Sequence, residues 1–267
     1  MIPSSVTSIE DIVFSYCTSL KTVIISDSVI SIGNNAFYNC SSLTTVTIGN
    51  SVKSIGYSTF ESCSSLTTVT IGNSVESIGE SAFYNCTSLK TVIISDSVVT
   101  IKHLAFYKCS SLMSITIGNS VTSIGNYSFY QCTSLTNITI PESVISIGDG
   151  AFSRCSNLAN VIYEGNNKPI CDSSVFRNVN VTVRVKNEYN GTDFCEIIIS
   201  ERESQSSCVD DTQGPGDKNK SVCSSVNESD KETTKRTTII TIVIFIAIHL
   251  VIEMLIQFFF DYNFFYF

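Results

Sequence analysis

The amino-acid sequence predicts a repeat solenoid in which each coil gives one strand to a parallel sheet, followed by a single transmembrane helix. Three observations support this fold class: a 23-residue period that recurs seven times, two β-branched columns two residues apart within each period, and a long apolar run near the C-terminus. We expect four segments: the solenoid with its C-terminal cap (residues 1–186), an acidic, Ser-rich flexible stalk (187–236), a transmembrane helix (237–260) and a short tail (261–267).

The period is carried by a Phe, a Cys and a Leu spaced three residues apart, as in Phe37, Cys40 and Leu43. A unit this short cannot bury its own apolar face, whereas stacked neighbours bury a continuous core. The period therefore predicts a solenoid. Its cysteine column comprises Cys17, Cys40, Cys63, Cys86, Cys109, Cys132 and Cys155.

In each unit the Leu is followed by two β-branched residues at alternate positions, such as Val46 and Ile48. Alternate residues of a strand point to the same side, and β-branched side chains favour strands, so we expect the strand of the coil here. A second apolar pair, three residues apart, follows, and most copies then have a glycine, such as Gly56. Because glycine tolerates positive φ, we expect a tight turn at that glycine.

The residues that alternate with the inward pair form a candidate binding face on the outside of the sheet. Most of their side chains are hydroxyls or amides, with scattered isoleucines between them. Solenoids offer such extended surfaces to partners. The candidate residues are Thr22, Thr45, Thr47, Thr68, Thr70, Thr91, Ser114, Thr116, Asn137, Thr139 and Asn160.

The segment CSSLTTVTIGNSVKSIGYSTF (residues 40–60) and its copies resemble the BspA-type leucine-rich repeats, which occur in surface proteins of bacteria and of protozoan parasites. The resemblance covers roughly residues 1–165. It implies a leucine-rich-repeat horseshoe and a role in adhesion or recognition, usually at a cell surface. It specifies no ligand.

The cysteine column has four interpretations: a metal array, a disulfide chain, a set of nucleophiles or packing. Zinc requires four ligands that converge on one point, whereas this column forms a line with no histidine column beside it. Equivalent Cα atoms in adjacent coils lie about 5 Å apart, within disulfide range, but stacked side chains point the same way and seven cannot all pair. We therefore expect a structural ladder of small, buried, apolar side chains. The later Cys195, Cys208 and Cys223 could pair, cross-link chains or stay free, and the sequence leaves these alternatives open.

After Leu158 the repeat frame loosens, with Pro169 and an off-register Cys171. Residues 178–185, NVNVTVRV, place valine at alternate positions, which predicts a final capping strand. Residues 187–236 carry 11 acids against 6 bases and few large apolar side chains, so we expect a flexible stalk there.

The segment from Ile239 to Phe260 is a 22-residue apolar run. As a helix it would be about 33 Å long, which matches the hydrocarbon core of a bilayer. His249 and Glu253 lie four residues apart and would share one face of this helix, where we expect snorkelling or contact with another helix.

Charge and motifs argue against nucleic-acid binding and catalysis. Residues 1–186 carry 11 acids against 10 bases, so they offer no basic stripe to a phosphate backbone. His103 is the only histidine in the sequence outside the apolar run, and the varied residues of its column indicate a solvent-facing turn. The sequence lacks a nucleophile elbow, a metalloprotease helix motif, a Walker loop and a dinucleotide-binding glycine motif. We predict no catalytic residue, no cofactor and no metal site.

Two functional hypotheses fit these features, and a hydrolase or other enzyme that uses His103 beside a Ser or Cys is a third, less favoured alternative. The first is a membrane-anchored, non-catalytic recognition or adhesion protein whose repeat sheet binds proteins or glycans on host cells or in the extracellular matrix. The second is a tail-anchored scaffold for protein–protein interaction that faces the cytoplasm, because Lys231, Lys235 and Arg236 precede the apolar run and no base follows it. The N-terminus shows no secretion signal, which agrees with the second hypothesis. The resemblance favours the first, which we prefer.

Overall fold

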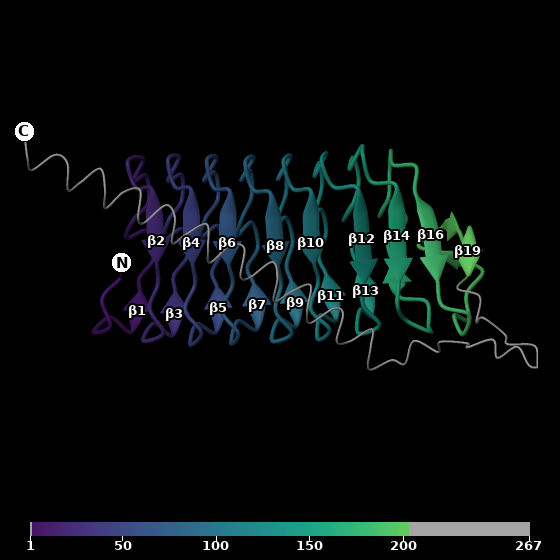
Figure 1. Cartoon of the computed structure of the whole chain (residues 1–267), viewed down its shortest axis with the longest axis horizontal. Coiled ribbons are helices and arrows are strands. Elements are labelled where there is room, and N and C mark those ends of the chain that lie inside the picture. Colours follow the sequence, from purple (N-terminus) through teal and green to yellow (C-terminus); the bar gives the residue numbers. More distant parts are fainter. Residues whose placement is uncertain (1, 203–267) are drawn as a thin grey trace, which may run out of the picture. The chain divides into compact units, whose positions relative to one another are not determined.

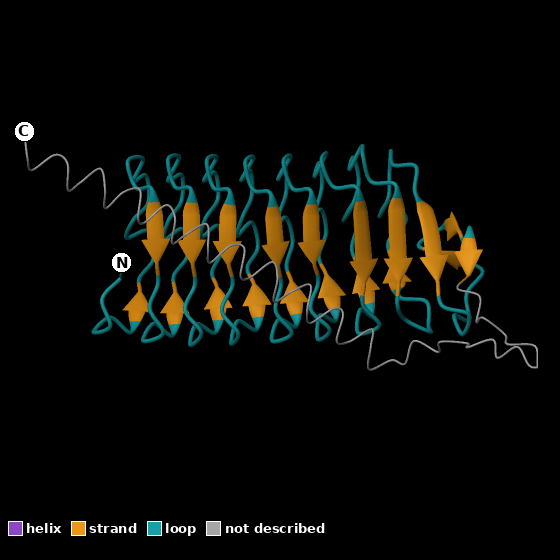
Figure 2. Cartoon of the chain, viewed as in Figure 1, coloured by secondary structure: helices purple, strands orange, loops and turns teal. Residues whose placement is uncertain are grey.

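The structure is a computed structural model of the chain, and it describes residues 2–202. Over these residues the chain winds into a β-solenoid of about eight coils (Figure 1). Up to residue 163, equivalent residues of adjacent coils lie 23 positions apart and pair in register, as Ser8 does with Ser31 and Thr22 with Thr45. No described residue is helical, because each coil consists only of strands and turns (Figure 2). The predicted solenoid is confirmed.

The strand expected after each Leu is present and forms one side of the coil. Its inward residue is buried and its outer residues are more exposed, as in Thr45–Thr47. The first five strands of this row pair in parallel, and the later strands form a second parallel sheet that continues the row (Figure 1). They are β2 (Thr22–Ile24), β4 (Thr45–Thr47), β6 (Thr68–Thr70), β8 (Thr91–Ile93), β10 (Ser114–Thr116), β12 (Asn137–Ile140), β14 (Asn160–Tyr163), β16 (Thr182–Val185) and β19 (Glu201–Arg202).

Each coil also contains a second strand, so the prediction of one strand per coil is wrong. The second strand covers the other apolar pair, but it is only two residues long, which is too short for alternation in the sequence to reveal it. These strands form an eight-stranded parallel sheet within the described residues. They are β1 (Ser8–Ile9), β3 (Ser31–Ile32), β5 (Ser54–Ile55), β7 (Ser77–Ile78), β9 (Thr100–Ile101), β11 (Ser123–Ile124), β13 (Ser146–Ile147) and β15 (Ile170–Cys171).

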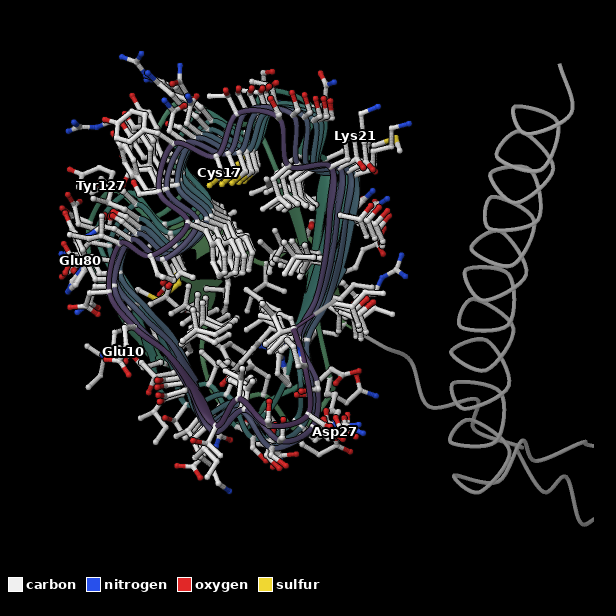
Figure 3. The ribbon with its side chains drawn as sticks, turned by 90° about the vertical axis from the view of Figure 1, so that its left-hand side faces the viewer. Glu10, Cys17, Lys21, Asp27, Glu80 and Tyr127 are labelled. Atoms are coloured by element: carbon white, nitrogen blue, oxygen red, sulfur yellow. A yellow bond between two sulfur atoms is a disulfide. The ribbon has the colours of Figure 1, made fainter. Side chains whose placement is uncertain are left out.

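The third side of each coil is a run of turns between the short strand and the cysteine, which we call the arc (residues 33–40 in the second coil). Alternate backbone N–H groups of the arc donate to carbonyls of the next coil, as Phe14 does to Ala36 at 2.8 Å. Two residues of each arc have positive φ, such as Asn35 at 53° and Asn39 at 54°. Viewed along the row, the coils superimpose (Figure 3), so the described solenoid is straight and the expected horseshoe curvature is absent from it.

The glycine that begins most arcs has a different role from the one expected. Positive φ falls two residues later, on Ser58 at 49° in the third coil, and not on Gly56. A Cβ added to Gly56 would lie 3.0 Å from the carbonyl carbon of Gly33, and one added to Gly125 would lie 2.6 Å from the carbonyl carbon of Lys102. The glycine column therefore allows close approach of neighbouring coils.

Phenylalanine rings stack along the interior of the solenoid. From Phe14 to Phe176 the successive ring centroids lie 5.1–5.6 Å apart and the rings are nearly parallel. The six rings from Phe37 to Phe152 are fully buried. Each such pair contributes roughly 0.5–1.5 kcal/mol beyond the burial of its surface. The stack of phenylalanine rings therefore stabilises each junction between the coils that contribute to it.

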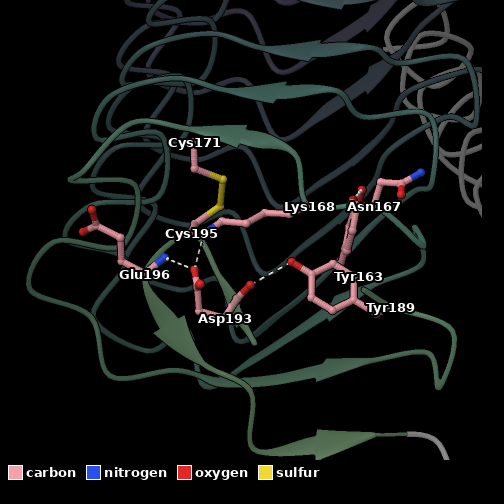
Figure 4. The surroundings of a disulfide bond; sticks show 8 residues. All are labelled: Tyr163, Asn167, Lys168, Cys171, Tyr189, Asp193, Cys195 and Glu196. Carbon is pink, nitrogen blue, oxygen red and sulfur yellow. Dashed lines mark hydrogen bonds and ion pairs between the residues drawn. A yellow bond between two sulfur atoms is a disulfide. The ribbon is translucent and has the colours of Figure 1, made fainter. Parts of the chain in front are cut away.

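The C-terminal cap extends further than the predicted boundary at residue 186. Tyr189 and Phe194 are buried, and β17 (Asp193–Phe194) pairs with β18 (Ile197–Ile198) as an antiparallel hairpin. A disulfide joins Cys171 to Cys195, with their Cα atoms 5.2 Å apart (Figure 4). The first part of the predicted stalk, up to residue 202, is therefore folded onto the last coil. The sequence missed this because these residues leave the 23-residue period.

The rest of the predicted stalk, the transmembrane helix (237–260) and the tail (261–267) lie outside the described residues, as do Cys208 and Cys223. Between residues 2 and 202, no helix is long and apolar enough to cross a membrane.

Candidate binding surface

The predicted binding residues gather on one outer face of the solenoid, because the strands that carry them pair in register. Lys21, which immediately precedes β2, marks this side of the coil in Figure 3. The side chains between the inward columns are exposed or half-exposed along β2 to β14. We call this set the threonine face; it comprises Thr22, Thr45, Thr47, Thr68, Thr70, Thr91, Ser114, Thr116, Asn137, Thr139 and Asn160.

The hydroxyls of the threonine face differ from those in the neighbouring column. Thr44 and Thr67, one residue before the face, donate to backbone carbonyls of the preceding coil at 2.9 and 3.0 Å. No threonine hydroxyl of the face itself makes a hydrogen bond within residues 2–202. Only at the C-terminal end do side chains of the face bond to each other, where Asn160 donates to Asn137 at 2.7 Å. The face thus presents unused donors and acceptors.

A second polar surface, which the sequence reasoning missed, lies on the arcs. Tyr84, Tyr107 and Tyr130 stack outside the coil with ring centroids 4.7 and 4.8 Å apart. Lys108 lies over the ring of Tyr107 at 5.5 Å, and Arg154 lies over that of Tyr130 at 5.6 Å. The stack could have been predicted from the sequence, because a tyrosine follows the phenylalanine directly in several copies of the 23-residue repeat.

The cysteine ladder lies inside the coil. Six of its seven members are buried, and Cys17 in the first coil is half-buried. The thiols donate to the carbonyl of the phenylalanine 26 residues earlier, as Cys63 does to Phe37 at 3.2 Å. Burial raises the pKa of Cys86 and of Cys109, which keeps these thiols protonated. A protonated, buried thiol is neither a nucleophile nor a metal ligand.

His103 is exposed and belongs to a ladder of side-chain caps. In this ladder, one side chain of a coil accepts a backbone N–H of the next coil. Its Nδ1 accepts the backbone N–H of Asn126 at 3.1 Å, and Oδ1 of Asn126 accepts that of Asp149 at 3.0 Å. The same position in earlier coils holds Asp11 and Asn34, which accept equivalent N–H groups. This histidine therefore has a structural partner on the surface of the coil.

No metal-binding constellation accompanies these surfaces in the part of the chain that the structure describes. Residues 2–202 contain no group of three or more His, Cys, Asp or Glu side chains placed to hold a metal. An open pocket of about 410 Å³ lies near the cap, where Lys186 and Glu142 pair at 3.8 Å. It is lined by Asn119, Pro141, Glu142, Ser143, Glu164 and Lys186.

A family profile described as "BspA type Leucine rich repeat region" matches residues 1–110 and 53–182, with six copies. The chain belongs to this family. Its expected resemblance to BspA-type leucine-rich repeats is thereby confirmed. No curated protein matches the chain.

Solved structures of leucine-rich repeat proteins resemble this BspA-type chain. A leucine-rich repeat protein of T. pallidum is 27% identical, with a TM-score of 0.54, and the match covers 66% of this chain and 78% of that one. A leucine-rich repeat protein of Bacteroides ovatus is 23% identical, with a TM-score of 0.39, over 74% of this chain and 64% of that one. A leucine rich cell surface protein of Faecalibacterium prausnitzii is 22% identical, with a TM-score of 0.37, over 74% and 83%.

Family and geometry together define the class of protein. BspA-type leucine-rich repeats build an interaction scaffold, and the described coils hold two extended polar surfaces on a rigid, repeated core. The two surfaces lie on different sides of the coil, since Lys21 beside the threonine face and Tyr127 on the arc point in opposite directions in Figure 3.

Proposed function

We propose that this chain is a membrane-anchored, non-catalytic recognition or adhesion protein of the cell surface. In this proposal the threonine face binds proteins or glycans on host cells or in the extracellular matrix. The observation that carries it is the row of unbonded hydroxyls along that face, because neighbouring hydroxyls of the same type are bonded to the backbone. Hydrogen bonds from many equivalent positions suit a partner that is itself extended or multivalent.

The disulfide in the cap supports an outward orientation. Cys171 and Cys195 are bonded to each other, whereas the repeat cysteines are buried as thiols. Structural disulfides persist in oxidising compartments and are rare in the reducing cytoplasm. This bond therefore favours the cell-surface topology over the cytoplasmic one.

Membrane attachment rests on the sequence alone. The apolar run from Ile239 to Phe260 lies outside the described residues, and its length matches a bilayer core. The residues between the cap and this run would act as the spacer that holds the coils away from the lipid.

A cytoplasmic tail-anchored scaffold is the second candidate function. Lys231, Lys235 and Arg236 precede the apolar run, and the residues after it contain no base. Positive charge is enriched on the cytoplasmic side of membrane helices, so this pattern places the coils in the cytoplasm.

Protease shaving of intact cells that produce the chain discriminates the two topologies. We expect trypsin, which cleaves after Lys and Arg, to release peptides from residues 2–202 while an internal marker protein stays intact. Release of these peptides only after lysis would reject the surface topology and support the scaffold.

A binding assay tests the threonine face itself. The double variant Thr70→Lys/Thr116→Lys places two long charged side chains on exposed positions of the face. Its matched control, Ile30→Lys/Val99→Lys, adds the same charge to exposed positions beside the eight-stranded sheet. We expect the first variant to reduce binding of the detergent-solubilised chain to host cells and matrix, and the control to retain it. Equal binding by both variants would exclude the threonine face as the contact surface.

A further inference from the structure

The arcs change charge along the solenoid. In the first four coils they carry Glu10, Asp11, Glu61 and Glu80 and no base. In the last four coils (residues 102–109, 125–132, 148–155 and 171–178) they carry four bases against two acids. The chain as a whole has a formal charge of −8, so this basic surface is a local departure from the composition.

Two of the four bases in the last four arcs lie against the stacked tyrosines. Lys108 and Arg154 lie over the rings of Tyr107 and Tyr130, and both cationic groups are exposed. Tyr127 is 37% exposed and meets the ring of Tyr130 edge-on at 5.7 Å. Rings that hold a cation on one face keep the charge in place beside the phenol groups.

One of the two acids in these arcs is already engaged. Asp149 accepts hydrogen bonds from Ser174 and from the hydroxyl of Tyr127. These bonds, led by that of Ser174, lower the pKa of Asp149, and the positive charge of Arg177 acts in the same direction. The backbone N–H of Arg154 donates to the carbonyl of Arg177 at 3.0 Å, so Arg177 lies beside Arg154 on the same surface. We call Tyr107, Tyr127, Tyr130, Lys108, Arg154 and Arg177 the aromatic–basic patch.

The backbone of the patch is not available to a ligand. The N–H groups of Leu104, Phe106 and Lys108 already donate to carbonyls of the next coil at 2.7–2.9 Å. A peptide that adds as a strand needs unpaired backbone groups at a sheet edge, and this surface has none to offer. A ligand here must be held by side chains: phenol rings, phenol hydroxyls and cations.

We propose that the aromatic–basic patch binds a linear anionic polysaccharide. Such a chain repeats hydroxylated rings along one direction, as the patch repeats tyrosines along the coils, and its acidic groups complement Lys108, Arg154 and Arg177. The proposal rests on the proposed recognition function only in that the coils must face outside the cell, and it does not depend on the threonine face.

Heparin binding by the full chain in detergent tests the proposal, with dextran as the neutral polysaccharide and poly-glutamate as the acidic peptide. We expect heparin to bind at low salt, dextran and poly-glutamate to bind far more weakly, and added salt to weaken the heparin complex. The variant Lys108→Gln/Arg154→Gln should lose about ten-fold in affinity, because an exposed ion pair contributes up to about five-fold. Lys21→Gln/Lys90→Gln removes the same charge beside the threonine face and should retain binding.

Each result has a definite meaning once the melting temperatures show that both variants are folded. Loss of heparin binding in the patch variant alone supports the proposal. Equal loss in both variants overturns it in favour of non-specific attraction, and poly-glutamate binding as tight as heparin binding overturns it in favour of an acidic peptide. A chain that binds host cells but not heparin overturns this proposal and leaves the proposed function intact. A chain that binds heparin in vitro but is not shaved from cells contradicts the surface topology and, with it, the outward orientation on which this proposal rests.

Discussion

The central coils and the C-terminal cap are stabilised in different ways. In the coils, each buried group meets its own copy 23 residues away, as the stacked phenylalanines do. The cap has no next copy, and it relies on a disulfide, a hairpin and the ion pairs Lys168–Asp193 and Arg184–Glu201 at 2.5 Å. A repeat thus needs only one set of complementary side chains, whereas the last coil needs its own set of local partners. Four predictions test this difference.

The largest effect is expected from Phe83→Ala in the middle of the stack. Phe83 is fully buried between Phe60 and Phe106, with ring centroids at 5.4 and 5.2 Å. The variant should lose about 3–5 kcal/mol in free energy of unfolding, a total that includes the cavity and the two broken stacks. Urea unfolding with hydrogen exchange measures this loss and should show that protection falls in coils on both sides.

The matched variant in the cap is Phe194→Ala. Phe194 is equally buried, but its nearest ring contact is a tilted one with Tyr163 at 4.8 Å. We expect protection to fall in the cap alone. If both variants lowered protection across the whole solenoid to the same extent, the cap and the coils would form one cooperative unit.

Removal of the disulfide should have the next largest effect, confined to the cap. The bond closes a separation of 24 residues, so Cys171→Ala/Cys195→Ala should cost about 3 kcal/mol. We expect limited proteolysis to cut after Lys186 or Arg202 in the variant and in the reduced native chain. Resistance of both to cleavage at these sites would show that the hairpin holds the cap without the bond.

Truncation of one repeat thiol should have a smaller effect. Cys109→Ala removes a buried sulfur and its hydrogen bond to the carbonyl of Phe83 at 3.2 Å, for a loss of roughly 1–2 kcal/mol in urea unfolding. Cys17→Ala, in the half-buried first position, is the control and should lose less. In a thiol titration of the native chain the six buried ladder thiols should stay unreactive until denaturant is added. Rapid labelling of these six in the native state would contradict the packing role.

The smallest effect concerns acid stability of the cap. The hydrogen bond from Lys168 lowers the pKa of Asp193 below its usual value. A carboxylate with a lowered folded pKa stabilises the fold above its unfolded pKa of about 3.9, and this contribution is lost as the pH falls through the folded pKa. Because the pair is exposed, we expect less than about 1 kcal/mol. Asp193→Asn and Lys168→Met should each remove the same pH-dependent part of the free energy of unfolding below pH 4, measured by urea unfolding. Different pH dependences in the two variants would show that the pair is not coupled.

The sequence predicted what repetition makes visible. The inward columns and the threonine face follow from the period, because each copy repeats the same burial pattern, as at Val46 and Ile48. The two-residue strands were missed because two residues show no periodicity. The predicted role of the glycine column was wrong because the glycines are needed where neighbouring coils approach closely, as at Gly125. The distance between coils is a tertiary property, and local backbone preferences do not determine it.

The cap shows a second kind of limit. Ile147 pairs with Cys171, 24 residues later, so the residues near Pro169 shift the coil by one place. Cys171 and Cys195 also lie 24 residues apart, one more than the period. The spacing of these two cysteines was the feature of the sequence from which the disulfide could have been predicted. The cap does not repeat, however, so no second copy of the segment was available to support that prediction. Which hydroxyls of the coil are free depends on contact geometry, since Thr44 is bonded and the adjacent Thr45 is not.

The ladder of side-chain caps has a consequence for how such a protein can change over generations. Asn34 caps its neighbour at a separation of 23 residues, and so do Asp11 and Asn126. Gain or loss of one whole unit leaves every such bond with an equivalent partner, whereas insertion of a single residue shifts the register of the bonds that span it. The gene can therefore lengthen or shorten its product in steps of one coil, about 4.8 Å each. Copy number then becomes a heritable measure of how long the solenoid is.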